Sequence, residues 1–238
     1  MRNVLRAAFA SLVLLAACSE ARPTPPLIVG LQKLAAANDA EAMYHLGMAY
    51  HTGSGLAEDP AKALAAFRRS AQLGDPLGAY KLGCYYDGQG GDVLEPDAEL
   101  ALRYKLVAAK AGYALAQQDV AKLYAGRRDF AVALDWLERA TAQGWPDALM
   151  TYASIHNGAD GITPDAVKTT AYFRLFLNSS EASDEQRRWL RDFEKKLSAA
   201  QRAQADALVR GFRPEPTVLT LKALSGQRAA EALVARRR

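Results

Sequence analysis

The stretch AMYHLGMAYHTGSG, residues 42–55, decides the fold, because its pattern returns further along the chain. A Tyr, a Leu-Gly pair, a second Tyr and two spaced glycines recur in residues 80–90, YKLGCYYDGQG. Reduced versions follow at residues 116–124 and 148–158. The equivalent small residues stand 36, 38 and 32 positions apart, at Gly47, Gly83, Ala121 and Ala153. An internal period of this length predicts a solenoid of stacked units.

Within each unit the apolar spacing predicts two helices. Leu46 and Tyr50 recur at helical intervals, and the small residue at Gly47 lets neighbouring helices approach closely. Asp59-Pro60 is a capping residue followed by proline, which marks the start of a second helix. One helix pair cannot bury its apolar face alone, so neighbouring pairs must stack into an all-α array. A glycine ends the second helix in three units, at Gly74, Gly112 and Gly144.

This pattern resembles the Sel-like repeat (SLR) family, which is related to the tetratricopeptide repeat. The resemblance covers about residues 34–176 and is strongest in the first two units, whereas the third lacks the Gly-x-Gly loop. It implies an α-solenoid of about four antiparallel helix pairs over residues 27–180, wound into a right-handed superhelix with a concave, ligand-holding surface.

The end of the array is also visible in the sequence. Two capping boxes, Ser183-x-x-Gln186 and Ser198-x-x-Gln201, predict amphipathic helices over residues 181–213 that cap the last repeat. After Pro214 the periodic pattern fades. Residues 214–238 are therefore expected to form a basic tail that is loosely held or disordered, with a helix from Ser225 as the alternative.

The N-terminus has the form of a secretory signal over residues 1–17. A basic region, residues 1–6, precedes an apolar run, residues 7–17, that is shorter than the ~20 residues needed to span a bilayer. The sequence LAAC, residues 15–18, resembles the lipobox of bacterial lipoproteins. That resemblance implies that Cys18 carries a lipid and that residues 18–26 form a Pro-rich tether. The alternative is an ordinary signal cut nearby, with Cys18 incidental.

A lipidated Cys18 would place the protein in the bacterial cell envelope. Several acyl chains suffice for stable membrane anchoring. Ser19 follows the cysteine in place of the aspartate that retains enterobacterial lipoproteins in the inner membrane. We therefore expect the outer membrane as the location, with the chain facing the periplasm.

The charge distribution argues against nucleic-acid binding. The formal net charge is +4, but the basic residues concentrate at the two ends and leave the repeats nearly neutral. A nucleic-acid binder usually presents a basic stripe on its folded surface.

No residue pattern points to catalysis, a metal or a cofactor. The three histidines (His45, His51 and His156) and Cys84 lack metal-ligand spacing. No nucleophile stands in a strand-turn-helix elbow. The acidic loop of the second unit is either a calcium site or a solvated loop, and the solvated loop is favoured because calcium-loop alternation is missing. Its carboxylates are Asp87, Asp92, Glu95, Asp97 and Glu99.

The related tetratricopeptide fold implies which side chains line the concave groove. Aromatic, thioether and amide groups with few charges suit a bound peptide or helix. The expected partner-binding residues are Glu41, Tyr44, Met48, His51, Leu77, Tyr80, Asp87, Gln118, Lys122, Asp147, Met150 and Asn157.

The sequence therefore predicts a non-catalytic repeat scaffold, lipid-anchored in the envelope, that binds an unknown protein or peptide. Two alternatives stay open. The first is a cell-wall-acting enzyme, although the cysteine-rich relatives linked with that role have disulfides that this chain lacks. The second is a structural spacer whose basic tail rests on anionic lipid or on an acidic partner.

Overall fold

A computed structural model describes residues 23–159, 161–179 and 182–237, and within these ranges every regular element is helical. This confirms the predicted all-α class. The α-helices are α1 (Pro26–Ala36), α2 (Ala40–Thr52), α3 (Pro60–Gln72), α4 (Pro76–Cys84), α5 (Ala98–Lys110), α6 (Ala114–Gly126), α7 (Phe130–Ala142), α8 (Pro146–His156), α9 (Ala166–Ser179), α10 (Asp184–Glu194), α11 (Ala199–Gly211), α12 (Val218–Ser225) and α13 (Gln227–Arg236). A π-helical turn, η1 (Tyr85–Gln89), and a 3-10 turn, η2 (Gly91–Val93), lie between α4 and α5.

Aspartates start many of these helices. Asp39 caps α2 by accepting a hydrogen bond from the Ala42 N–H, and Asp59 caps α3 through the Lys62 N–H. Because each cap satisfies a backbone donor that the helix leaves unpaired, the start of each helix is fixed locally. Equivalent caps at α4, α5 and α7 are Asp75, Asp97 and Asp129.

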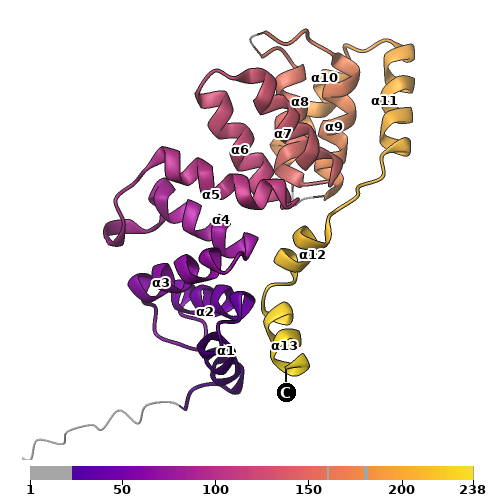
Figure 1. The fold of residues 1–238 in the computed structure, drawn as a ribbon. Helices are drawn as coiled ribbons and strands as arrows, with labels where there is room; N and C mark the ends of the chain where they lie inside the picture. Colours follow the sequence, from indigo (N-terminus) through magenta and orange to yellow (C-terminus); the bar gives the residue numbers. More distant parts are fainter. Residues whose placement is uncertain (1–22, 160, 180–181, 238) are drawn as a thin grey trace, which may run out of the picture.

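The α-helices pair in chain order as α2–α3, α4–α5, α6–α7 and α8–α9, and the pairs stack into a curved row (Figure 1). Close approach within a pair depends on glycine, as the sequence indicated. A Cβ atom on Gly47 would lie 2.7 Å from the Phe67 ring, and one on Gly83 would lie 2.9 Å from Lys105 Cγ. We call the surface formed by the first helices, α2, α4, α6 and α8, the inner face.

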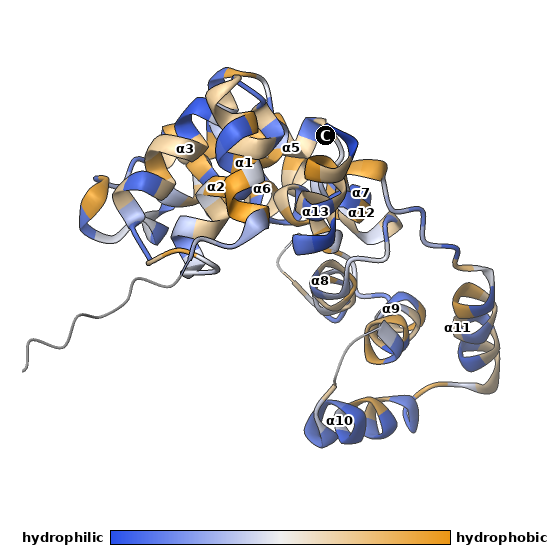
Figure 2. Cartoon of the chain, turned by 90° about the horizontal axis from the view of Figure 1, so that it is seen from below, coloured by the Kyte–Doolittle hydropathy of each residue, from blue (hydrophilic) through white to orange (hydrophobic). Residues whose placement is uncertain are grey.

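Helices α10 and α11 lie against α9, the last helix of the four stacked pairs. Both capping boxes form, since each serine accepts from the glutamine N–H and each glutamine side chain accepts from the serine N–H. Both helices pack on α9 and lie well apart from each other (Figure 2). Trp189 of α10 packs on Phe173 of α9, with 4.8 Å between the ring centroids.

The segment after Pro214 differs from the expected loose tail. It forms α12 and α13, which run back along the array towards α1 and α2 (Figure 1). The expected alternative of a helix from Ser225 is close to the observed start of α13 at Gln227. We call residues 214–237 the return segment.

Apolar burial explains why the return segment is ordered. Leu233 and Val234 are buried against Ile28 and Leu31 of α1. A Cβ atom on Gly30 would come within 2.5 Å of Val234 Cγ1, so this glycine lets α13 seat closely. Burial of such side chains contributes about 1.5–3 kcal/mol each, which favours docking over a free tail.

The proposed signal sequence and Cys18 lie outside the described residues. In the part of the chain that the structure describes, no helix combines the length and the apolar character needed to cross a bilayer.

Candidate functional site

The N-terminal part of the inner face is covered by the return segment. Lys222 of α12 places its Nζ 2.8 Å from Glu41 Oε2 at the start of α2. The imidazole of His45, whose Nε2 lies 3.8 Å from Glu41 Oε1, and the Lys222 ammonium together lower the pKa of Glu41 to about 2. Glu41, expected to face a partner, thus faces the chain's own tail.

Two further groove residues, Tyr44 and Met48, line a cavity of about 460 Å³ between α1, α2 and α13. Ala223 and Ala230 of the return segment form its opposite wall. Burial raises the pKa of Tyr44 to about 12, so its hydroxyl stays protonated. The groove predicted over the first repeat is therefore partly filled by residues of the same chain.

A buried hydrogen-bond network attaches the return segment to the third pair. The Thr220 hydroxyl oxygen accepts from the Ala114 N–H at 3.0 Å and lies 2.7 Å from Gln143 Oε1. The Thr217 hydroxyl donates to the Gly112 carbonyl at 2.9 Å, and the Thr217 N–H donates to Gln143 Oε1 at 3.0 Å. Since Gly112 has a φ of +96° and a Cβ there would lie 2.8 Å from Thr217 Cγ2, this turn fits glycine alone. Bonds of this kind fix the path of the segment.

The middle of the inner face carries a network of ionisable groups. Lys105, only 2% exposed, pairs with Asp87 and lies 3.3 Å from Asp119 Oδ2. Tyr80 donates to the same Asp119 oxygen at 3.0 Å. Burial alone would lower the pKa of Lys105, but the hydrogen bond to Asp87 and the charge of Asp119 outweigh it and raise the pKa. Lys105 therefore stays a cation that holds two carboxylates.

Neighbours of this network are buried core residues. Leu77 and Cys84 are each 1% exposed. Burial raises the pKa of the Cys84 thiol, as well as that of the Tyr80 hydroxyl, so both groups stay protonated. The first-repeat groove residue His51 is committed to a hydrogen bond between its Nδ1 and the Tyr85 hydroxyl at 3.0 Å.

Further along the array the inner face is open. Gln118 and Lys122 of α6 line an apolar hollow of about 310 Å³ between α6, α7 and α8. Met150 and Asn157 of α8 line a second cavity of about 310 Å³, whose opposite wall includes Phe173 and Trp189. Asp147 stands exposed in the first turn of α8. The predicted groove residues thus divide among separate surfaces and do not form one continuous site.

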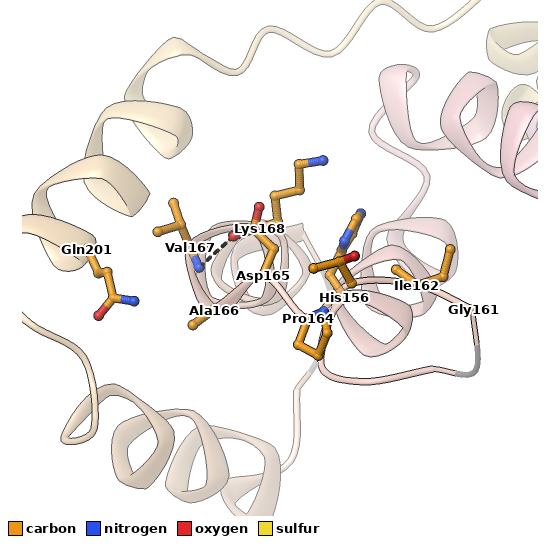
Figure 3. A pocket seen from close by; sticks show the side chains of 10 residues that line it. His156, Gly161, Ile162, Pro164, Asp165, Ala166, Val167, Lys168 and Gln201 are labelled. Atoms are coloured by element: carbon orange, nitrogen blue, oxygen red, sulfur yellow. Dashed lines mark hydrogen bonds between the residues drawn. The ribbon is translucent and has the colours of Figure 1, made fainter.

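A cavity of about 470 Å³ surrounds His156 at the end of α8 (Figure 3). Asp165 and Lys168 from the start of α9 and Gln201 from α11 line it. Asp165 is engaged as a helix cap, accepting from the Val167 and Lys168 N–H groups. Burial lowers the pKa of His156, so its ring is neutral and suited to packing on Tyr152, 4.6 Å away.

The acidic loop of the second repeat does not gather its carboxylates. Asp97 caps α5, and Glu99 pairs with Arg127 at 2.7 Å. Across the described ranges no group of three or more His, Cys, Asp or Glu side chains could hold a metal ion.

Several residues that shape the inner face were not singled out by the sequence. Lys105 and Asp119 lie on neighbouring repeats and come together through stacking alone. Thr220 and Gln143 are 77 positions apart. The one local signal for the return segment is the Thr217-x-x-Thr220 spacing of a helix cap, which the structure uses at the start of α12.

Comparisons with known proteins agree with this geometry. The Sel1 repeat family matches residues 40–75, 76–113 and 114–145, which coincide with the first three helix pairs. Three consecutive stretches of the chain are therefore similar to Sel1 repeats, and the pair α8–α9 follows them. No curated protein is significantly similar to the chain.

Two solved structures share the architecture. A Sel1 repeat protein from Oxalobacter formigenes has a TM-score of 0.58 and 27% identity, with 64% of each chain covered. The protective antigen c5321 of uropathogenic Escherichia coli, which displays an SLR fold, has a TM-score of 0.50 and 21% identity. That match covers 89% of this chain and 51% of the antigen, so the chain spans 64% and about half of these two relatives. The predicted solenoid of this repeat type is thus confirmed.

Proposed function

We propose that the protein is a binding scaffold whose inner face holds a segment of another protein. The observation that carries this proposal is the return segment itself, because α12 and α13 lie on the inner face as a bound helical ligand would. Helix-in-groove recognition reuses the same apolar and capping contacts that a protein makes internally. An inner face that accommodates two of its own helices has the shape and chemistry for another.

The free part of this surface lies over α6 and α8. The return segment packs on α1 and α2 and is bonded at the start of α6, whereas Lys122 and Asn157 stay exposed near the opposite helix ends. We therefore propose that the partner binds over the third and fourth pairs.

Binding without catalysis is also a proposal. Lys105, Asp119 and Tyr80 are committed to one another, which leaves none of them free as an acid or base. The Cys84 thiol has a raised pKa and is buried, the opposite of what a nucleophilic cysteine needs.

The test is photo-cross-linking in cells. A photoreactive residue at Lys122 should capture a distinct partner, because this position borders the open hollow. The same residue at Arg103, which is exposed on the second helix α5, serves as the matched control. Capture at both positions alike, or at neither, would contradict the proposed surface.

We further propose that Cys18 anchors the chain to the bacterial envelope, in the outer membrane and facing the periplasm. The support is the LAAC sequence at the end of the apolar run, and Ser19 after it. Metabolic labelling with palmitate should mark the wild-type chain and leave Cys18→Ser unlabelled. An unlabelled wild-type chain, or equal labelling of the variant, would refute the anchor.

A further inference from the structure

Stacking creates three equivalent slots between successive helix pairs. Each slot is closed by three residues: one from the end of a first helix, one from the second helix of the same pair, and one from the first helix of the next pair, where the turn η1 counts as the end of α4. The repeat spacing assigns them as His51, Phe67 and Tyr85 (first slot), Asp87, Lys105 and Leu123 (second slot), and Ala125, Leu137 and Ile155 (third slot).

The first two slots are filled by large or charged side chains. In the first slot the Phe67 and Tyr85 rings lie 5.5 Å apart, edge to face, and His51 closes the slot through its bond to the Tyr85 hydroxyl. In the second slot Lys105 pairs with Asp87. Both fillings come from the chain itself.

The third slot is hollow. Ala125, Leu137 and Ile155 are smaller than the aromatic trio, and all three line the apolar cavity of about 310 Å³. The loop from α8 to α9 corresponds to the loop that brings Leu94 beside the first slot, and it brings Ile162 to the wall of the hollow without filling it. Phe130 at its rim is 48% exposed.

A residue in the wall of the same hollow carries a buried polar atom without a partner. Gln118 is 1% exposed, and its Oε1 makes no hydrogen bond within the described structure. An unpaired buried acceptor costs about 1–3 kcal/mol. In the first two repeats the equivalent positions are Tyr44 and Tyr80, so the smaller Gln118 leaves more space and places an unpaired acceptor in the wall of the hollow.

We propose that the third slot receives an aromatic side chain with an N–H or O–H donor, Trp or Tyr, from the partner protein. This proposal rests on the scaffold function proposed above and specifies which kind of partner side chain enters the slot. The first slot shows what fills such a space when the chain supplies it: aromatic rings, one with a hydroxyl in a hydrogen bond. Aromatic residues with a polar group are frequent anchors at protein interfaces.

The positive charge of Lys122 at the opening of the hollow indicates which partner residue lies next to the aromatic one. Lys122 is exposed, lines the hollow and has no ion-pair partner among the described residues. A partner segment with an aromatic residue next to a carboxylate would give Gln118 Oε1 a hydrogen-bond donor and Lys122 an ion-pair partner.

The test titrates the purified chain with indole, and with indene as the isosteric probe that lacks the N–H group. The chain has three isoleucines: Ile155 and Ile162 line the hollow, and Ile28 lies beside α13. With the isoleucine methyl groups labelled with carbon-13, indole should shift the signals of Ile155 and Ile162 and leave Ile28 unmoved. Indole should bind about fivefold more tightly than indene, as one added hydrogen bond predicts.

Two variants and a control locate the effect. Ala125→Phe fills the slot and should abolish the indole-induced shifts, while Ala131→Phe, an exposed alanine of α7 outside the hollow, should retain them. Gln118→Met keeps the volume but removes the acceptor, so indole and indene should bind alike. Unmoved Ile155 and Ile162 signals, or equal binding of both probes to the wild-type chain, would overturn the proposal.

Cross-linking at position 122 separates this inference from the scaffold function. If the wild-type chain captures a partner and Ala125→Phe captures it equally well, the anchor assignment fails and the scaffold stands. If indole binds but the wild-type chain captures nothing, the scaffold proposal fails and the slot is a small-molecule site. Loss of capture in Ala125→Phe alone supports both proposals.

Discussion

The two halves of the array solve the same packing problem differently. Between the first two pairs an aromatic trio fills the slot, and the return segment covers the inner face. Between the last two pairs aliphatic side chains leave a hollow, and the inner face is open. The same repeat pattern therefore gives a first half whose apolar surface is covered by the chain itself and a second half whose apolar surface is partly uncovered. We infer that stability is concentrated in the first half, whereas the binding surface proposed above lies in the second.

The largest effect should come from emptying the first slot. Phe67 is fully buried, so Phe67→Ala should lower the free energy of unfolding by about 3–5 kcal/mol. The matched change in the second half, Phe130→Ala, removes a half-exposed ring at the rim of the hollow and should cost less than about 1 kcal/mol. Urea unfolding followed by circular dichroism measures both. Equal losses would contradict the contrast between the halves.

The boundary between the halves depends on Lys105. Lys105→Met removes the cation between Asp87 and Asp119 and should lower stability by about 1–3 kcal/mol, below the full cost of a broken buried pair because Asp87 is 40% exposed. Lys110→Met, on the exposed end of the same helix, is the control and should change little. Urea unfolding at pH 7 gives both values. An unchanged midpoint for Lys105→Met would show that the carboxylates need no counter-charge.

The repeat frame could be predicted from the sequence because its signals are local. Asp59-Pro60 marks a helix start at its own position, and Gly83 marks a close approach to the next helix of the same pair, at Lys105. The cap helices were predicted for the same reason, from the boxes at Ser183 and Ser198.

The order of the return segment could not be predicted, because its contacts are long-range. Thr220 bonds to Ala114 at a separation of 106 positions, and no local pattern encodes that pairing. The hollow was missed for another reason. Gln118 and Lys122 were expected to line a groove, but an unfilled slot depends on the combined volumes of Ala125, Leu137 and Ile155, which come from three helices.

Acid should lower the stability of the first half by protonating Glu41. Its folded-state pKa, about 2, lies below the ordinary value of 4.5. The carboxylate therefore stabilises the folded chain above about pH 4.5, and this contribution is lost as the pH falls towards 2. Glu41→Gln should cost about 1–2 kcal/mol at pH 7 and much less at pH 2.5.

Urea unfolding at the two pH values measures this difference. A double-mutant cycle with Lys222→Met assigns it to the return segment, because the two changes should be less than additive. A cost for Glu41→Gln that is the same at pH 7 and pH 2.5 would rule out the ion pair as its source.

The smallest effects should come from adding side-chain volume to each half. Here the sign of the change in the free energy of unfolding is the informative quantity. Ile155→Phe adds ring volume to the hollow and should raise the free energy of unfolding by up to about 1 kcal/mol, as cavity-filling changes do. Added volume beside the first slot should do the opposite. Ala63 is fully buried in the cluster with Phe67 and Tyr85, so Ala63→Val should lower stability by about 1 kcal/mol or more. Thermal unfolding of the two variants compares the signs directly. If Ile155→Phe destabilises the chain as Ala63→Val does, the third slot is already packed, and the proposed division between a stable half and a binding half fails with it.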